Sequence, residues 1–121
     1  MSKSVEFLIR QNLITVFSER DAEKRRAIIA SLWAADGVFI DPDGVHVGRA
    51  AIDQTAEQLL RKYRNFVFTE LGPVDGYHGI GRLAWGFGPP GATPAMTGIG
   101  VLVSANEQFS ALYTFVDPAK S

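Results

Sequence analysis

In the first part of the chain, apolar residues recur at intervals of three and four, which is typical of helices that bury one face. The first run comprises Val5, Leu8, Ile9, Leu13, Val16 and Phe17. Ser18 followed by Asp21 resembles a capping box, and this pair predicts the opening of a second helix. The inward residues expected on that helix are Ile28, Ile29, Leu32 and Trp33.

A third helix is predicted to follow Gly48, because apolar and charged residues again separate onto two faces. The apolar stripe consists of Ile52, Ala56, Leu59 and Tyr63. The residues expected to face away from the core are Asp53, Glu57, Arg61 and Lys62.

Beyond Arg64 the helical spacing gives way to the alternation of strands. The segments rich in β-branched and aromatic residues are 65–71, 79–88, 95–105 and 108–116. Turn residues separate these segments, so neighbouring strands are expected to pair as antiparallel hairpins. Alternation predicts two apolar rows that fill a core or line a cavity. One row is Leu83, Trp85 and Phe87, and the other is Thr97, Ile99, Val101 and Val103.

Helices followed by long strands, with one early hairpin, predict an α+β domain over residues 1–121. The helices are expected to pack on one face of a curved antiparallel sheet. Glycines within the long strands permit strong bending. A bent sheet wrapped on helices would leave a conical hollow.

Composition and charge narrow the classes of function. The 121 residues include no Cys, which excludes a disulfide framework, a thiolate nucleophile and a zinc–thiolate site. A net charge of −1 provides no field that would gather nucleic acid. The basic cluster Lys24-Arg25-Arg26 stands beside Glu19, Asp21 and Glu23, and it is predicted to form a solvated helix face.

The hydropathy pattern bears on location. Charged residues interrupt the first turns of the chain, and no long uncharged apolar run occurs elsewhere. Neither a signal peptide nor a membrane span is therefore expected. A cytoplasmic location is the resulting expectation.

The motif with the clearest chemistry is a strand that ends in a carboxylate, turns tightly and returns over residues 38–47. Asp41-Pro42-Asp43-Gly44 fits a type I turn, in which Asp41 accepts backbone hydrogen bonds. The same turn would place Asp41 at the mouth of the hollow, where it could act as a general base. The two roles do not exclude one another, and both remain open.

A resemblance to a known superfamily rests on the order of the elements and on one stretch of sequence. That stretch is Leu32-Trp33-Ala34-Ala35-Asp36-Gly37-Val38-Phe39-Ile40-Asp41-Pro42, followed by Gly48-Arg49. Over nearly its whole length the chain resembles the nuclear transport factor 2-like superfamily, and in particular its SnoaL-like polyketide cyclases and ketosteroid isomerase-like proteins. The resemblance implies a cone-shaped α+β barrel, an apolar pocket and a homodimer. The superfamily hosts isomerases, dehydratases, cyclases, hydrolases and noncatalytic binders.

By this resemblance Asp41 matches the general base of the isomerases, an Asp directly before Pro that removes a proton α to a carbonyl. In ketosteroid isomerase a Tyr and a protonated Asp stabilise the oxyanion that forms. The chain departs from that pattern, because no Tyr lies near Leu13, and Gly98, Ile99 and Gly100 stand where the acid would be. A different set of donors would have to stabilise an enolate here.

The two histidines are further candidates. His78 opens a predicted strand, where it either serves an oxyanion or a proton relay or lies on the surface. His46 alternates with Val45 and Val47, so it faces the pocket if those valines pack into the core, with exposure to solvent as the equal alternative. No spacing motif gathers both histidines and Asp41 into a metal site, and neither a metal nor a cofactor is predicted.

Five other side chains are candidates for ligand binding. Tyr63 and Trp85 each combine an apolar body with one donor, which suits either core packing or the orientation of a flat ligand. Arg82 either binds a carbonyl or carboxylate oxygen or faces outward from the sheet. Trp33 and Phe39 are expected beside Asp41.

Two hypotheses on function follow. The first is a cofactor-independent isomerase, cyclase or dehydratase that acts on a small hydrophobic carbonyl compound, with Asp41 as base and His78, Tyr63 or Trp85 as donors. The second is a noncatalytic ligand-binding or dimerisation module, which the missing oxyanion pair favours. The expected partners are a small hydrophobic molecule and a second copy of the chain, and neither nucleic acid nor a membrane is expected.

Overall fold

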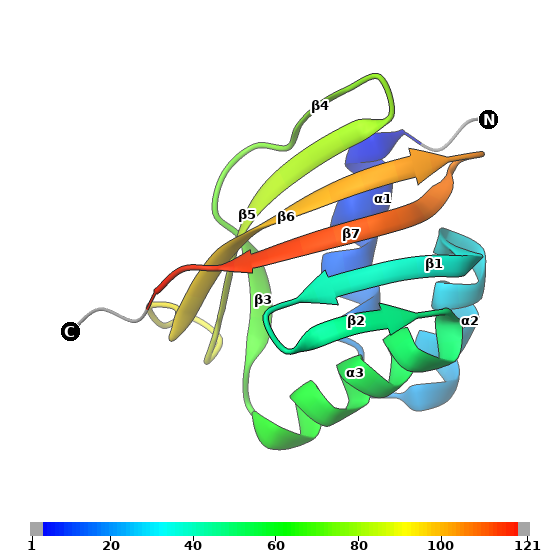
Figure 1. The fold of residues 1–121 in the computed structure, drawn as a ribbon. Coiled ribbons are helices and arrows are strands. Elements are labelled where there is room, and N and C mark those ends of the chain that lie inside the picture. Colours follow the sequence, from blue (N-terminus) through cyan, green and yellow to red (C-terminus); the bar gives the residue numbers. More distant parts are fainter. Residues whose placement is uncertain (1–3, 119–121) are drawn as a thin grey trace.

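The computed structural model describes residues 4–118 and has the predicted α+β architecture, with helices packed on a strongly curved, mixed sheet (Figure 1). The helices are α1 (Val5–Gln11), the π-helix η1 (Asn12–Val16), α2 (Ala22–Leu32) and α3 (Arg49–Lys62). The strands are β1 (Trp33–Asp41), β2 (Gly44–Val47), β3 (Val67–Glu70), β4 (Asp75–Tyr77), β5 (Ile80–Gly88), β6 (Met96–Ala105) and β7 (Gln108–Val116).

The sheet has the strand order β2-β1-β7-β6-β5-β3, and β4 pairs with β5 beside β3. The predicted hairpins β5–β6 and β6–β7 are confirmed as antiparallel pairs. The pairing of β1 with β7 is parallel and joins an early strand to the last one. Strand β4 was not expected, because it lies in the connection between the predicted strand segments 65–71 and 79–88. Its residues extend because β5 continues past β3 and offers them a free edge.

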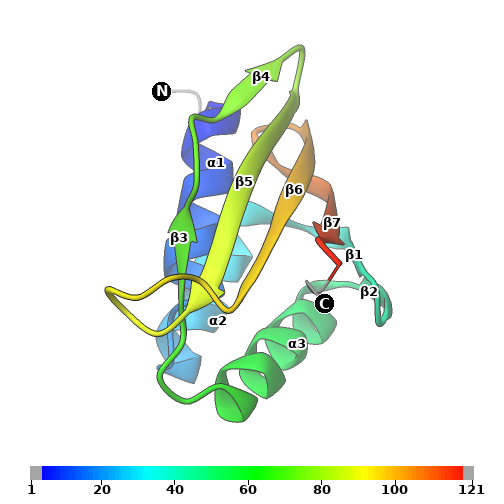
Figure 2. The ribbon, with the colours of Figure 1, turned by 90° about the vertical axis from the view of Figure 1, so that its left-hand side faces the viewer.

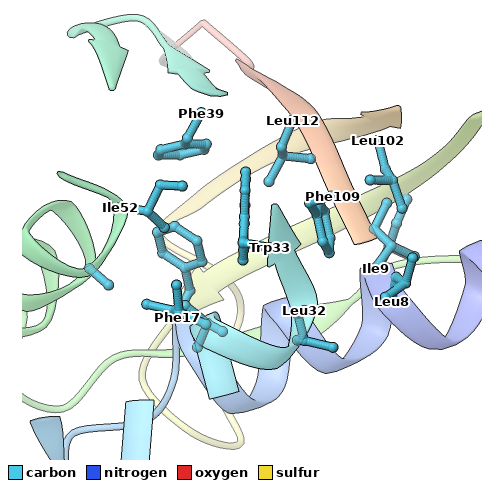
Figure 3. Close-up of a cluster of buried hydrophobic side chains, with 14 residues drawn as sticks. Leu8, Ile9, Phe17, Leu32, Trp33, Phe39, Ile52, Leu102, Phe109 and Leu112 are labelled. Carbon is cyan, nitrogen blue, oxygen red and sulfur yellow. The ribbon is translucent and has the colours of Figure 1, made fainter. Parts of the chain in front are cut away.

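The helices lie on one side of the sheet (Figures 1 and 2), and the core fills the space between them. Trp33 is fully buried there, and its ring stacks on Phe109 with the ring centroids 4.5 Å apart (Figure 3). Leu83, Trp85 and Phe87 face this interior, as alternation predicts. No helix among residues 4–118 is long and apolar enough to cross a membrane.

The second predicted apolar row lies on the opposite side of the sheet. Leu102, which lies between the positions of that row on β6, is buried, whereas Val101 and Val103 are only half-buried. Alternation separated the two faces of β6 correctly, but the face with the larger number of branched apolar residues is the outer one. The inner face of β6 contains glycines instead, and these leave room for large side chains from β5.

The first predicted helix changes its winding part of the way along. Residues 5–11 are α-helical, and from Asn12 the chain widens into a π-helix in which Phe17 N donates to Asn12 O at 3.1 Å. Helices of this kind are rare and are frequent at functional sites.

The second helix begins later than the capping box predicts. Asp21 is the N-cap, and its Oδ1 accepts from Glu23 N at 3.0 Å and Lys24 N at 3.2 Å. Ser18 donates instead to Leu13 O at 3.1 Å and accepts from Phe68 N at 3.2 Å. The predicted role of Ser18 is therefore wrong, because its hydroxyl joins the end of the first helix to β3.

The prediction of a solvated basic cluster is wrong for Arg25, whose side chain is 1% exposed. Its Nε lies 2.7 Å from Asp53 Oδ1, a second nitrogen pairs with Glu57 Oε2, and a third donates to Glu19 O at 2.8 Å. Asp53 and Glu57 thus turn toward α2 rather than away from the core. Arg can be buried in this way because its planar guanidinium serves several acceptors at once. Lys24 and Arg26 are exposed, as predicted.

The ion pairs between α2 and α3 shift the pKa values of their members. Burial by itself would lower the pKa of Arg25, but hydrogen bonds to Asp53 and Glu57 outweigh it and the pKa is raised. The hydrogen bond from Arg25 lowers the pKa of Glu57 below its usual value of 4.5. Both shifts favour the charged pair in the folded protein.

We expect Glu57→Gln to flatten the loss of stability in acid. A carboxyl whose pKa is lowered on folding contributes stability above its unfolded pKa, and this contribution is lost as the pH falls through the lower folded value. Urea unfolding of both proteins between about pH 6 and about pH 3 measures the effect. Parallel stability curves for the two proteins would contradict it.

Candidate functional site

A cavity of about 630 Å³ opens between the helices and the inner face of the sheet. This volume lies within the range of small-molecule sites. The apolar part of the lining includes Leu13, Phe17, Phe68, Leu83, Phe87 and Leu112. The polar part includes Asn12, Asp41, His46, Thr55 and Tyr63.

Asp41 ends β1 at the cavity, and its side chain is 15% exposed. Its Oδ1 accepts from the backbone N–H groups of Asp43 at 3.0 Å and Gly44 at 3.1 Å. The predicted turn-forming role is thus confirmed. Oδ2 makes no hydrogen bond to any residue in the described part of the chain. One oxygen therefore holds the turn while the other can take part in chemistry.

His46 faces the cavity from β2, directly across the β1–β2 pair from Phe39. Its Nε2 lies 3.2 Å from Asp41 Oδ1, and its ring stacks on Phe39 with the centroids 5.6 Å apart. Val45 and Val47 point outward and are 64% and 62% exposed. The sequence placed His46 in the pocket on the condition that these two valines pack into the core, and the structure shows the reverse of that condition. An ionised carboxylate only accepts hydrogen bonds, so Nε2 donates to it and Nδ1 keeps its lone pair in the neutral ring.

Phe39, Tyr63 and Trp85 also line the cavity. Tyr63 follows α3, and Arg20 anchors its carbonyl with a hydrogen bond of 2.9 Å. Trp85 lies over Gly98, its register partner on β6, where an added Cβ would come within 2.4 Å of the indole. Gly98 therefore makes room for the indole in the cavity wall.

The structure does not bring Trp33, His78 or Arg82 to the cavity, and these three assignments need correction. Trp33 packs in the core behind the lining, where it is the register partner of Phe109 on β7 and stacks on its ring. His78 is an exposed turn residue with a φ of 51° between β4 and β5, and it begins no strand. Arg82 faces outward, with its side chain 64% exposed and its Nε 3.7 Å from Asp75 Oδ2.

Residues 4–118 contain no group of three or more His, Cys, Asp or Glu side chains that could hold a metal ion. Asp41 and His46 form a pair, while His78 lies in the β4–β5 turn. Asp41 and His46 thus place a carboxylate beside an imidazole at the cavity, and Asp43, Lys62 and Tyr63 are the other titratable side chains that line it.

Asn12 is a cavity residue that the sequence interpretation missed. It is 3% exposed, and its Oδ1 accepts a hydrogen bond of 2.9 Å from Trp33 Nε1. A signal was present, because Asn12 stands four residues from Leu8 and from Val16, both of which lie on the inward face of the first helix. An amide at such a position must find a buried partner or a polar ligand.

Comparison with other proteins supplies structural relatives only. The sequence matches no protein-family model and no curated protein. Among solved structures, a candidate isomerase of the SnoaL-like family from Agrobacterium tumefaciens superposes with a TM-score of 0.85 at 24% identity, over 93% of this chain and 97% of that one. This chain has the nuclear transport factor 2-like fold.

Two further structures with the nuclear transport factor 2-like fold are similar to it. A candidate ketosteroid isomerase from Kribbella flavida gives a TM-score of 0.71 at 16% identity, over 96% of this chain and 79% of that one. A candidate polyketide cyclase from Sinorhizobium meliloti gives a TM-score of 0.69 at 15% identity, over 89% of this chain and 93% of that one. The resemblance inferred from the sequence is therefore confirmed at the level of the fold.

Proposed function

We propose that this protein is an enzyme that moves a proton on a small, largely apolar carbonyl compound without a cofactor, with Asp41 as general base. The observation that supports the proposal is the Asp41–His46 pair, with Nε2 and Oδ1 3.2 Å apart, at an apolar cavity of about 630 Å³. Removal of a proton α to a carbonyl needs a positioned base in such surroundings. This step is one that isomerases, cyclases and dehydratases of carbonyl compounds can share.

The roles of the two side chains follow from their contacts. Oδ1 of Asp41 is occupied by the turn and by His46, so Oδ2 takes the substrate proton. His46 fixes the rotation of the carboxylate and, when protonated, offsets its charge. Phe39, stacked on His46, supplies an apolar surface for the carbon skeleton of the substrate.

Exchange of acetophenone methyl protons in heavy water tests the proposal, because it reports α-proton removal from a simple ketone that fits the cavity. We expect catalytic amounts of the protein to speed the exchange above the buffer rate, as followed by proton NMR. Ethylbenzene, a hydrocarbon of similar shape, should compete with acetophenone. Acetophenone that binds without faster exchange would contradict catalysis and favour the noncatalytic ligand-binding alternative.

We also propose that two copies of the chain associate through the outer face of the sheet. Register places apolar residues side by side across β2, β1, β7 and β6 in the row Val45, Ile40, Tyr113 and Val101. Phe115, Tyr113 and Ile80 on this face are 61%, 39% and 49% exposed. Apolar surface of this kind marks an interaction site, and the same face on two copies can pair about a twofold axis.

Light scattering at micromolar concentration is expected to give the mass of a dimer. Tyr113→Glu places a charge within the apolar row and should shift the mass to that of a monomer, because an unpaired charge cannot be buried cheaply. Gln54→Glu, which adds the same charge on the exposed side of α3, serves as the control. A monomeric mass for the unaltered protein would contradict the proposed dimer.

A further inference from the structure

We infer that the side-chain amide of Asn12 donates the hydrogen bond that holds the carbonyl oxygen of the ligand in this cavity, and that Trp33 is the positioning residue that fixes its direction. The inference rests on the proposed function and adds to it the missing partner of Asp41. It gives the ligand a defined polar feature, a carbonyl oxygen directed toward the first helix.

The orientation of the Asn12 amide follows from its partner. An indole N–H can only donate, so the atom of Asn12 that lies 2.9 Å from Trp33 Nε1 is the carbonyl oxygen, Oδ1. The amide nitrogen, Nδ2, must then point away from Trp33. Trp33 is itself held in place, because it is fully buried and its ring stacks on Phe109.

The amide nitrogen has no protein partner in the described part of the chain, although Asn12 is only 3% exposed. Every fully buried side-chain nitrogen or oxygen among residues 4–118 has a hydrogen-bond partner. Nδ2 therefore retains some open surface, and the space that Asn12 lines is the cavity. A donor left free in an apolar cavity binds an acceptor that the ligand brings.

The backbone at this point supports a site rather than a packing defect. Asn12 opens the π-helix, and its carbonyl accepts from Phe17 N across the widened turn. Single π turns of this kind persist mostly where they serve a function, because the geometry is less favourable than that of an α-helix. Here the turn occurs at the polar residue of an otherwise apolar stripe.

The chemistry can be written with its protons and electrons balanced. Oδ2 of Asp41 takes the α-proton, and the electron pair of the C–H bond forms a C=C bond. The π pair of the C=O bond moves to oxygen, and the enolate oxygen accepts the N–H of Asn12. Return of the proton from Asp41 to carbon restores the carboxylate. The hydrogen bond strengthens as charge develops on oxygen, which is the condition for catalysis by such a donor.

Two measurements on bound acetophenone test the inference. The first is the infrared carbonyl stretching band, which a hydrogen bond shifts to lower frequency. The second is the ratio of the affinities for acetophenone and ethylbenzene, which isolates the contribution of the carbonyl group. We expect Asn12→Leu to return the band toward its position in a hydrocarbon solvent and to lower the ratio about five- to tenfold.

Further variants keep the result interpretable. Asn12→Ala also removes the donor and replaces Asn12→Leu if that protein does not fold. Trp33→Phe keeps the aromatic packing but releases the amide, so the carbonyl band should broaden and the ratio should fall by a smaller factor. Thr15→Val is the matched control, because Thr15 lies on the same π-helix but does not line the cavity. The change removes a hydroxyl that donates to Gln11 O.

The outcomes separate this inference from the proposed function. An unchanged band and ratio in both Asn12 variants would overturn the inference while leaving Asp41 and the cavity untouched. An unchanged band in Trp33→Phe would overturn the positioning role. Failure of the unaltered protein to bind either compound would overturn the proposed function and the inference together.

Discussion

Asp41→Asn is expected to slow the catalysed exchange of acetophenone methyl protons by about a hundred- to ten-thousandfold. The amide cannot accept the proton that Oδ2 would take. Its remaining oxygen can still accept from Asp43 N and Gly44 N, so the turn and the cavity should persist. Proton NMR in heavy water gives the rate, and titration with acetophenone shows whether binding is retained.

The control for this variant is Asp36→Asn. Asp36 is an exposed carboxylate on the same strand and does not line the cavity, so the variant removes the same charge without touching the site. Exchange should proceed in it at the unaltered rate. Equal rates in Asp41→Asn and the unaltered protein would remove Asp41 from the role of base.

The largest effect on stability is expected at Arg25. Arg25→Met should lower the free energy of unfolding by about 3 kcal/mol, because Asp53 and Glu57 lose the buried guanidinium that they share and keep only the exposed Arg26 and Arg61 as cationic partners. The side chains of Asp53 and Glu57 are 16% and 31% exposed, so water relieves only part of this cost. Urea unfolding followed by circular dichroism measures the change.

The neighbouring residue offers a matched comparison. Arg26 is 57% exposed and lies 3.8 Å from Asp53 Oδ2, and Arg26→Met should change the stability by no more than about 0.5 kcal/mol. If both variants lower the free energy of unfolding by the same amount, the burial of Arg25 adds nothing to its contribution to stability, and the prediction is wrong.

The sequence predicted most of the fold because the relevant signals are local. Helical spacing located the three helices, and alternation gave both hairpins of β5, β6 and β7. The turn at Asp41 is also local, since it depends on Pro42, Gly44 and their backbone. The carboxylate at the cavity could therefore be predicted from residues adjacent in the chain.

The errors arose where the outcome depends on contacts between distant segments. Arg25 is buried only because α3 brings Asp53 and Glu57 across it, and Trp33 leaves the cavity only because Phe109 of the last strand takes its ring. His78 was assigned to a strand because β4 was not foreseen. Asn12 acquires its role from Trp33, far along the chain, and no periodicity encodes that pairing.

The parallel contact between β1 and β7 has a consequence for biosynthesis. Strand β1, which ends at Asp41, pairs with β2 on one side. On its other side β1 has no partner until β7 is available. Leu112 of β7 also forms part of the cavity wall. During translation the helices and the hairpin of β1 and β2 therefore emerge long before the sheet can enclose a ligand. The closing of such a distant contact is the slow part of folding, so the binding site should be acquired only when the final strand leaves the ribosome.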